Sequence, residues 1–448
     1  MSGIRFIHTA DLHLGSPLKT AGEISKRLQK SLKESTYRAV ESIVDAAIEL
    51  DVDFVLVCGD IYDNEARSVK GSLFFTEELR RLEQKEIPVF IIYGNHDPAE
   101  KGADFFKLPP NVKVFSAESA EMHLAGAKSG KAQARIVGQS YRGPRESRKM
   151  HLNYSPPFDD RINIAMLHTG LDPGSNAYVP SSAEELKGRE NIHYWALGHI
   201  HAPTIISGEN PAIAYPGNPQ GRDVGERGLK GCFLVEMGSP GAVSIKFIPT
   251  SPVVWHSCRL TLDDSLPLKS LDDLEALIAE RGEALIDSPL EIPHDLPAVE
   301  NGFEPEGHVV RWEIGGRNPI YEELVSGREQ EVVDVLKNNL NRRLAAATPY
   351  LWTEGIKLRL GPPIPDLAVL LQQDETIKML HEVKENILKD ENLKNEALSA
   401  MGGIWYRPRG EDDLREDTFP VTGEKLRALL EDAFDAVMER ILKERESR

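Results

Sequence analysis

Residues 87–97 read IPVFIIYGNHD, an apolar run that ends in a glycine and three polar residues. The apolar part predicts a buried strand, and Gly94 predicts a tight turn where that strand leaves the core. Asn95, His96 and Asp97 could serve only as a turn, because Asn and Asp tolerate turn geometry. They also have side chains suited to metal ions, and the rest of the chain favours this second interpretation.

Four more apolar segments in residues 1–250 also end in polar residues. They are IRFIHTA (4–10), followed by Asp11 and His13; DFVLVCG (53–59), followed by Asp60 and Asp63; INIAMLH (162–168), which ends in His168; and HYWALGH (193–199), which ends in His199 and is followed by His201. Open α/β sheets place their sites at the carboxyl ends of strands. We therefore expect these side chains to meet at one site.

The segments between these strands predict helices, because residues 27–50 and 72–84 carry apolar side chains at helical spacing. Apolar strands separated by helices indicate a layered α/β fold with covered, mixed sheets. A Pro-rich stretch and a change in charge near residue 250 mark a boundary. We predict a domain at 1–250, a small α+β capping domain at 251–362 and a mostly helical, acidic region at 363–448.

Composition limits the classes of function. The chain has 448 residues and a net charge of −18. Residues 1–250 carry 29 basic and 31 acidic side chains, whereas residues 251–448 carry 24 and 40. This excess of acidic side chains disfavours nucleic-acid binding through a broad basic face, because it repels phosphate backbones. Any attraction to DNA must therefore be local. The apolar runs are too short for a membrane span, and no secretory signal is visible. The three cysteines predict reduced thiols in a cytoplasmic protein.

Imidazole, carboxylate and amide ligands without cysteine suit Mn, Fe or Zn in a catalytic site. Two such cations need a bridging carboxylate, and Asp11 and Asp60 are the only two carboxylates that must bind directly. Neutral histidine and asparagine ligands would leave the pair with surplus positive charge. This charge would bind a phosphate and acidify a bridging water to hydroxide near neutral pH.

In order, the motifs DLH, GDIYD, GNHD, LHTG and GHIH resemble the signature of the calcineurin-like metallophosphoesterases. The resemblance implies a four-layer sandwich of mixed sheets flanked by helices. It implies that Asp60 bridges two cations, that His96 faces the substrate and assists the leaving oxygen, and that Asp63 orients His96. The implied ligands are Asp11, His13, Asp60 and His201 for one cation, and Asp60, Asn95, His168 and His199 for the other.

Residues 8–18 (HTADLHLGSPL) and 215–232 (YPGNPQGRDVGERGLKGC) are similar to the DNA repair exonuclease branch of that superfamily, the SbcD-like and YhaO-like proteins. The branch implies Mn-dependent exonuclease and endonuclease cleavage of DNA phosphodiesters by a metal-bridged hydroxide. It also implies a capping domain, an SbcC-like coiled-coil ATPase partner and a homodimer.

Two other functions stay open. The chain could hydrolyse nucleotides or other small phosphate esters, which its acidic surface favours, or serve mainly as a regulatory subunit of an ATPase. Arg222 and Arg227 could contact DNA phosphates or belong to a solvated loop. The basic run at 142–149 is the best basic patch in the sequence, although a solvated loop is the favoured interpretation of it.

Overall fold

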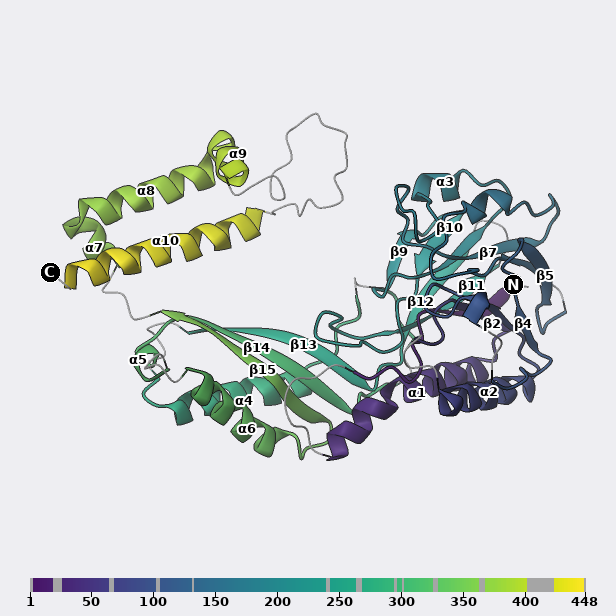
Figure 1. Ribbon diagram of the computed structural model, residues 1–448, viewed down its shortest axis with the longest axis horizontal. Coiled ribbons are helices and arrows are strands. Elements are labelled where there is room, and N and C mark those ends of the chain that lie inside the picture. Colours follow the sequence, from purple (N-terminus) through teal and green to yellow (C-terminus); the bar gives the residue numbers. More distant parts are fainter. Residues whose placement is uncertain are drawn as a thin grey trace. The chain divides into compact units, whose positions relative to one another are not determined.

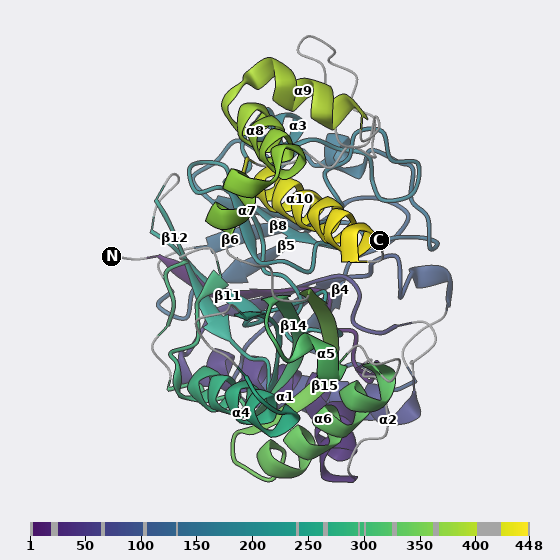
Figure 2. The same cartoon turned by 90° about the vertical axis from the view of Figure 1, so that its left-hand side faces the viewer.

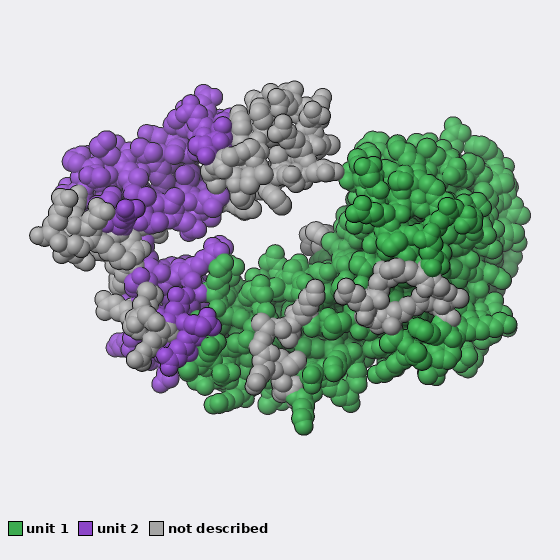
Figure 3. Space-filling view, viewed as in Figure 1, with its two compact units in different colours: residues 1–258, 275–313, 333–357 green, residues 259–274, 314–332, 358–448 purple. Residues whose placement is uncertain are grey.

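The computed structural model divides into two compact units, coloured separately in Figure 3: residues 1–258, 275–313 and 333–357, and residues 259–274, 314–332 and 358–448. The residues described are 3–18, 26–63, 68–101, 105–130, 133–238, 242–262, 268–293, 296–299, 302–324, 329–361, 367–400 and 423–446. The three domains expected from the sequence stay a prediction. Their second boundary, at 362/363, lies outside the described residues.

The first sheet has the strand order β12-β11-β1-β2-β3-β4. Its strands are β1 (Ile4–Thr9), β2 (Phe54–Cys58), β3 (Val89–Ile92), β4 (Val112–Val114), β11 (Gly231–Met237) and β12 (Val243–Pro249). Strands β1 to β4 run parallel, whereas β11 pairs antiparallel with β1 and β12 antiparallel with β11. The loops that follow β1, β2 and β3 therefore emerge at the same edge of this sheet.

The second sheet has the order β5-β6-β7-β8-β10-β9. Its strands are β5 (Glu121–Gly126), β6 (Gln133–Gly138), β7 (Ile162–His168), β8 (Tyr194–Gly198), β9 (Thr204–Ser207) and β10 (Ala212–Tyr215). Strands β6, β7, β8 and β10 are parallel, and β5 and β9 are antiparallel edge strands. Both sheets are mixed, as expected.

Alternating side chains divide each strand between two cores. Phe6, Phe54 and Leu56 face the second sheet and pack in one core with Ile164 and Met166. The neighbouring residues of β1 and β2 point the other way, onto α1 (Lys26–Glu49) and α2 (Val69–Glu83). The outer face of the second sheet packs against α3 (Ala183–Lys187) and nearby loops. Figures 1 and 2 show this order of layers, and the layered fold predicted from the sequence is confirmed.

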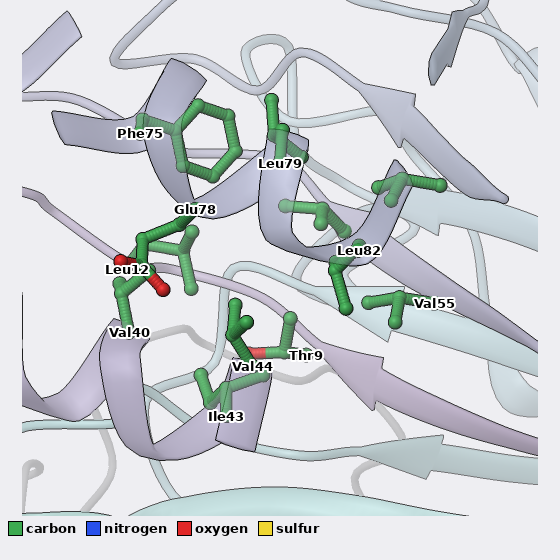
Figure 4. A pocket seen from close by; sticks show the side chains of 12 residues that line it. Thr9, Leu12, Val40, Ile43, Val44, Val55, Phe75, Glu78, Leu79 and Leu82 are labelled. Carbon is green, nitrogen blue, oxygen red and sulfur yellow. The ribbon is translucent and has the colours of Figure 1, made fainter. Parts of the chain in front are cut away.

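The core between the first sheet and its helices contains a cavity of about 20 Å³ (Figure 4). Aliphatic side chains from α1, α2 and the strands line it, among them Val44, Val55 and Leu82. Glu78 is the charged residue in its lining, and its carboxylate accepts a hydrogen bond from Arg81 over 2.6 Å. So apolar a cavity suits packing and not the binding of a phosphate.

A third sheet has the order β13-β14-β15, with β13 at Val253–Leu262, β14 at Gly307–Arg317 and β15 at Tyr350–Gly361. Helices α4 (Leu271–Asp287), α5 (Tyr321–Leu324) and α6 (Glu329–Leu344) accompany these strands, and α4 and α6 lie on the same side of the sheet in Figure 1. The 3₁₀ turns η1 (Ala99–Lys101) and η2 (Met150–Asn153) belong to loops of the first unit.

The C-terminal part of the chain is helical, as expected. It comprises α7 (Leu367–Gln373), α8 (Glu375–Lys389), α9 (Glu391–Ala400) and α10 (Gly423–Glu446). Asp374 caps α8 by accepting from the amide of Thr376, and Ile377 of α8 packs with Phe434 and Met438 of α10. Among the described residues, no helix is both long and apolar enough to cross a membrane.

Candidate dinuclear metal centre

The predicted ligands lie on sharply bent backbone. Asp11, His13, Asp60 and His199 have positive φ angles of 52°, 41°, 53° and 100°. Hydrogen bonds between the loop after β1 and the loop after β2 hold the bends at Asp11, His13 and Asp60. The amide of Asp11 donates to the Gly59 carbonyl and that of His13 to the Asp60 carbonyl, both over 3.0 Å. Non-glycine residues in this region cost about 1–3 kcal/mol each and cluster at functional sites. The placement of these four side chains therefore lowers the stability of the fold.

Asp11, His13 and His201 form one group, with a ligand atom of each within 4.8 Å of the others. The two histidines approach each other through their Nε2 atoms, 3.2 Å apart. His201 Nδ1 lies 2.7 Å from Glu226 Oε1, so this nitrogen carries the proton and donates it to the carboxylate. The Nε2 lone pair of neutral His201 is then directed at His13, where a cation can accept it.

A second group contains Asp60, His168, Asn95 and His199. His168 Nδ1 donates to the Cys58 carbonyl over 2.9 Å, which leaves Nε2 of the neutral ring as an acceptor. That Nε2 lies 3.0 Å from Asn95 Oδ1 and 3.4 Å from Asp60 Oδ2. His199 Nδ1 lies 3.1 Å from the same Asn95 oxygen. Several acceptors thus converge on one point, and a divalent cation fits this donor set.

Asp60 lies between the groups. Asp11, Asp60 and His168 form a further metal-competent triplet, so one chain of ligand atoms joins both groups. Burial tends to raise the pKa of Asp60, but His168 beside it holds that pKa below its ordinary value. Against the effect of burial, Asp60 in turn raises the pKa of His168 to about 9. The cluster therefore attracts positive charge, which a proton or a cation can supply.

Burial sets the charge of three other ligands. It raises the pKa of Asp11 to about 6 and lowers the pKa values of His13 and His199 to about 3 each. The two histidines are therefore neutral near pH 7, which is the form that binds a metal.

His96 lies at the edge of this cluster, with 38% of its side chain exposed. Its Nδ1 lies 2.8 Å from Asp63 Oδ1, and its amide donates to Asp60 Oδ1 over 2.8 Å. The other Asp63 oxygen accepts a 2.8 Å hydrogen bond from Arg222. Burial tends to raise the pKa of Asp63, but the Arg222 guanidinium keeps it below its ordinary value. Asp63 is thus an ionised partner for His96.

Asp97 has the turn function that the sequence left open. Its carboxylate accepts hydrogen bonds from the amides of Gly94, over 2.9 Å, and Ile61, over 2.7 Å. It therefore ties the loop after β3 to the loop after β2.

Residues 4–203 match the family model described as calcineurin-like phosphoesterase. The chain carries a calcineurin-like phosphoesterase domain. Over 273 residues it is 34% identical to the protein named uncharacterized metallophosphoesterase YhaO of Bacillus subtilis, an alignment that covers 60% of this chain and 66% of that protein.

Proteins named DNA double-strand break repair protein Mre11 are more distant relatives. The chain is 25% identical over 238 residues to that of Archaeoglobus fulgidus, which covers 50% of this chain and 52% of the relative. It is 24% identical over 268 residues to that of Methanopyrus kandleri, with coverage of 55% and 56%. The chain thus spans between about half and two thirds of the length of these curated relatives.

The predicted family is confirmed, and with it the expectation of a metal-dependent phosphoesterase domain. The family uses a dinuclear metal site, and the described histidine and aspartate side chains include groups able to hold metal ions. All seven predicted ligands, together with His96 and Asp63, lie in this one cluster. Their individual roles stay predictions.

The two tentative phosphate-binding arginines differ in position. Arg222 reaches the site through Asp63, whereas Arg227 is exposed and, among the described residues, makes no hydrogen bond or ion pair with the cluster. The sequence reasoning missed Glu226, whose carboxylate faces His201 and whose pKa His201 lowers to about 2 against the effect of burial. It lies inside the quoted segment 215–232, but nothing in that segment pairs it with a histidine.

Proposed function

We propose that this chain is a metal-dependent phosphodiesterase that hydrolyses DNA phosphodiester bonds, with exonuclease and endonuclease modes. The observation that carries the proposal is the pair of ligand groups joined through Asp60, with His96 held at their edge by Asp63. The names of the more distant relatives, DNA double-strand break repair proteins, support DNA as the substrate.

The ligand groups divide between two cations that share Asp60. Asp11, His13 and His201 would hold one, and Asn95, His168 and His199 the other. Such cations, when bound, bind the anionic phosphate and lower the pKa of water. We propose Mn²⁺ for both, because mixed imidazole, carboxylate and amide ligands suit it.

His96 is the group that we assign to proton transfer. Because Asp63 holds the Nδ1–H, Nε2 is the atom that can carry a second proton and deliver it to the leaving oxygen of the phosphodiester. The Asp63 carboxylate fixes the orientation of the ring through this contact. General acid catalysis of this kind contributes about 10²–10⁴-fold to a rate.

Further parts of the proposal concern organisation and partners. Residues 1–250 would form the nuclease domain, residues 251–362 a capping domain and residues 363–448 an accessory helical region. We propose a homodimer that acts with an SbcC-like coiled-coil ATPase. Exposed apolar side chains on α8, Met379 and Val383, support a protein partner for the helical region. The three free cysteines support a reducing, cytoplasmic location.

The test is cleavage of end-labelled single- and double-stranded DNA in Mn²⁺, with bis-p-nitrophenyl phosphate as a small ester. Wild type is compared with His96→Ala and with His123→Ala, a control for loss of a partly exposed histidine beside an acidic residue. We expect DNA products from wild type and from the control but not from His96→Ala. Turnover of the small ester with all DNA intact would instead favour a phosphoesterase of nucleotides or other small esters.

A further inference from the structure

The segment between β10 and β11, residues 218–230, has buried polar side chains, which is unusual for a connection. Asn218, Gln220 and Lys230 are 1%, 2% and 4% exposed. Burying polar and charged groups is costly unless each finds a partner. The partners in this segment show what the burial achieves.

Glu226 makes the central contacts. Its Oε1 accepts from His201 Nδ1 over 2.7 Å, and its Oε2 accepts from Asn218 Nδ2 over 2.6 Å and from the Arg222 amide over 2.9 Å. The carboxylate is therefore fixed from three sides, so its position relative to the His201 ring is fixed as well. A carboxylate at this place sets the tautomer and the orientation of a metal-binding imidazole.

The same segment also holds the backbone of His201. Lys230 Nζ donates to the His201 carbonyl over 2.8 Å, and the Lys230 amide donates to Ser251 Oγ over 3.1 Å. His201 is thus secured at its ring by Glu226 and at its main chain by Lys230. This double attachment restricts the ring more than either contact would alone.

Arg222 extends the contacts to the other side of the cluster. Its amide is bound by Glu226, and its guanidinium donates to Asp63 Oδ2 over 2.8 Å. The second Asp63 oxygen faces His96 Nδ1. A continuous series of hydrogen bonds therefore leads from His201 through Glu226, Arg222 and Asp63 to His96.

We propose that the 218–230 segment positions both parts of the active site, with Glu226 orienting His201 toward one cation and Arg222 orienting His96 through Asp63. Arg222 then acts on a residue of the protein and not on a phosphate of the substrate. The part that concerns Glu226 is independent of the substrate, whereas the part that concerns Arg222 rests on the proposed function.

Titration of the metal-free protein with Mn²⁺ in a calorimeter tests the Glu226 part. Glu226→Gln keeps the shape of the side chain but loses its charge. We expect one of two bound Mn²⁺ to weaken about 10–100-fold and the other to keep its wild-type affinity. Glu118→Gln is the matched control, because Glu118 is an exposed carboxylate that pairs with Arg142 and is not a predicted ligand; this variant should bind both ions like wild type.

A merely structural role for Glu226 would affect both ions, or the midpoint of thermal unfolding, without this selectivity. Wild-type Mn²⁺ affinity at both sites, or an equal loss of affinity at the two sites, would therefore overturn the proposal. Should Glu226→Gln fail to fold, Glu226→Asp supplies the same test, because the shorter chain keeps the charge but withdraws the oxygen from His201. It should weaken the same single ion.

Steady-state hydrolysis of bis-p-nitrophenyl phosphate in Mn²⁺ tests the Arg222 part. We expect Arg222→Gln to lower kcat at least 10-fold with KM and both Mn²⁺ affinities near wild type, and Arg222→Lys to restore part of kcat. A raised KM with kcat retained would show that Arg222 contacts the substrate, and would overturn this part.

The two proposals fail in different ways. Wild type that cleaves DNA while Glu226→Gln binds both ions normally would refute the positioning role alone. If Glu226→Gln selectively loses one ion but wild type cleaves neither DNA nor the ester, the proposed function alone would be refuted.

Discussion

Adding a Cβ atom at Gly94 tests the geometry of the candidate metal centre without removing any of its predicted ligands. A Cβ atom at this position would collide with Asp60 Oδ1 and would lie 2.9 Å from both the Asp60 amide nitrogen and His168 Cε1. Ordinary van der Waals contact begins near 3.4 Å. Gly94→Ala must therefore displace the Asp60 loop or the His168 ring by at least about 0.5 Å, and the Asp60 carboxylate by more. Both residues are proposed ligands, so the change alters the centre without removing a ligand.

A displacement of about 1 Å in a reacting group can cost about 10²-fold in rate, and overpacking of a tight site costs about 1–3 kcal/mol of stability. We expect Gly94→Ala to lower kcat for bis-p-nitrophenyl phosphate by about 10²-fold and to weaken Mn²⁺ binding in calorimetry. Gly126→Ala is the matched control, since a Cβ there meets no atom within 4 Å. Near wild-type activity in Gly94→Ala would show that Asp60 and His168 do not need this geometry, and would refute the reasoning.

Four further outcomes are expected. Asp63→Asn should lower kcat about 10²–10⁴-fold with little change in Mn²⁺ affinity, because it removes the charge that orients His96; a parallel loss of metal in calorimetry would contradict this. Asp97→Asn should destabilise the fold by about 1–3 kcal/mol in urea unfolding, because the side-chain nitrogen that replaces one carboxylate oxygen cannot accept from a buried amide; an unchanged midpoint would count against the turn role. Burial lowers the pKa values of His256 and His308 to about 4, so the unfolded chain takes up protons first and stability should fall as pH drops from about 6.5 toward 4. His308→Gln should make the unfolding midpoint depend less on pH in that range, and an equal dependence would exclude His308 as a source of it. Removal of Mn²⁺ with a chelator should lower stability by about 2.7 kcal/mol for each ion lost, or about 5.4 kcal/mol for two independent sites, relative to protein with free Mn²⁺ at 100-fold excess over Kd. An unchanged thermal midpoint would mean that the ions do not bind the native state preferentially.

The central strands were predictable because they are buried on both faces. FVLVC of β2 is a continuous apolar run that Gly59 separates from Asp60, and INIAMLH of β7 is apolar apart from Asn163 and ends in the predicted ligand His168. Shorter or edge strands, such as β9 and β10, give weaker patterns, and residues 212–215 become a strand by pairing with β8 and β9. Strand β15 was not among the predicted strands, although the alternation of apolar and charged residues in IKLRL (356–360) is typical of a strand with one exposed face.

The residues that directly surround the site could be predicted because local motifs at strand ends contain them. The residues that hold them could not. Glu226 lies 25 residues beyond His201, and Arg222 lies 159 residues beyond Asp63. Only the pairing of β11 with β1 and the path of the 218–230 segment bring these partners together. Their side chains look like those of an ordinary polar loop until the fold is known.

The most direct test of the dinuclear centre is anomalous diffraction from crystals of the full chain soaked in Mn²⁺. The account predicts two peaks within the cluster, both in contact with Asp60, one beside His13 and His201 and the other beside Asn95, His168 and His199. A single peak, or peaks that leave Asp60 without contact to either ion, would contradict it.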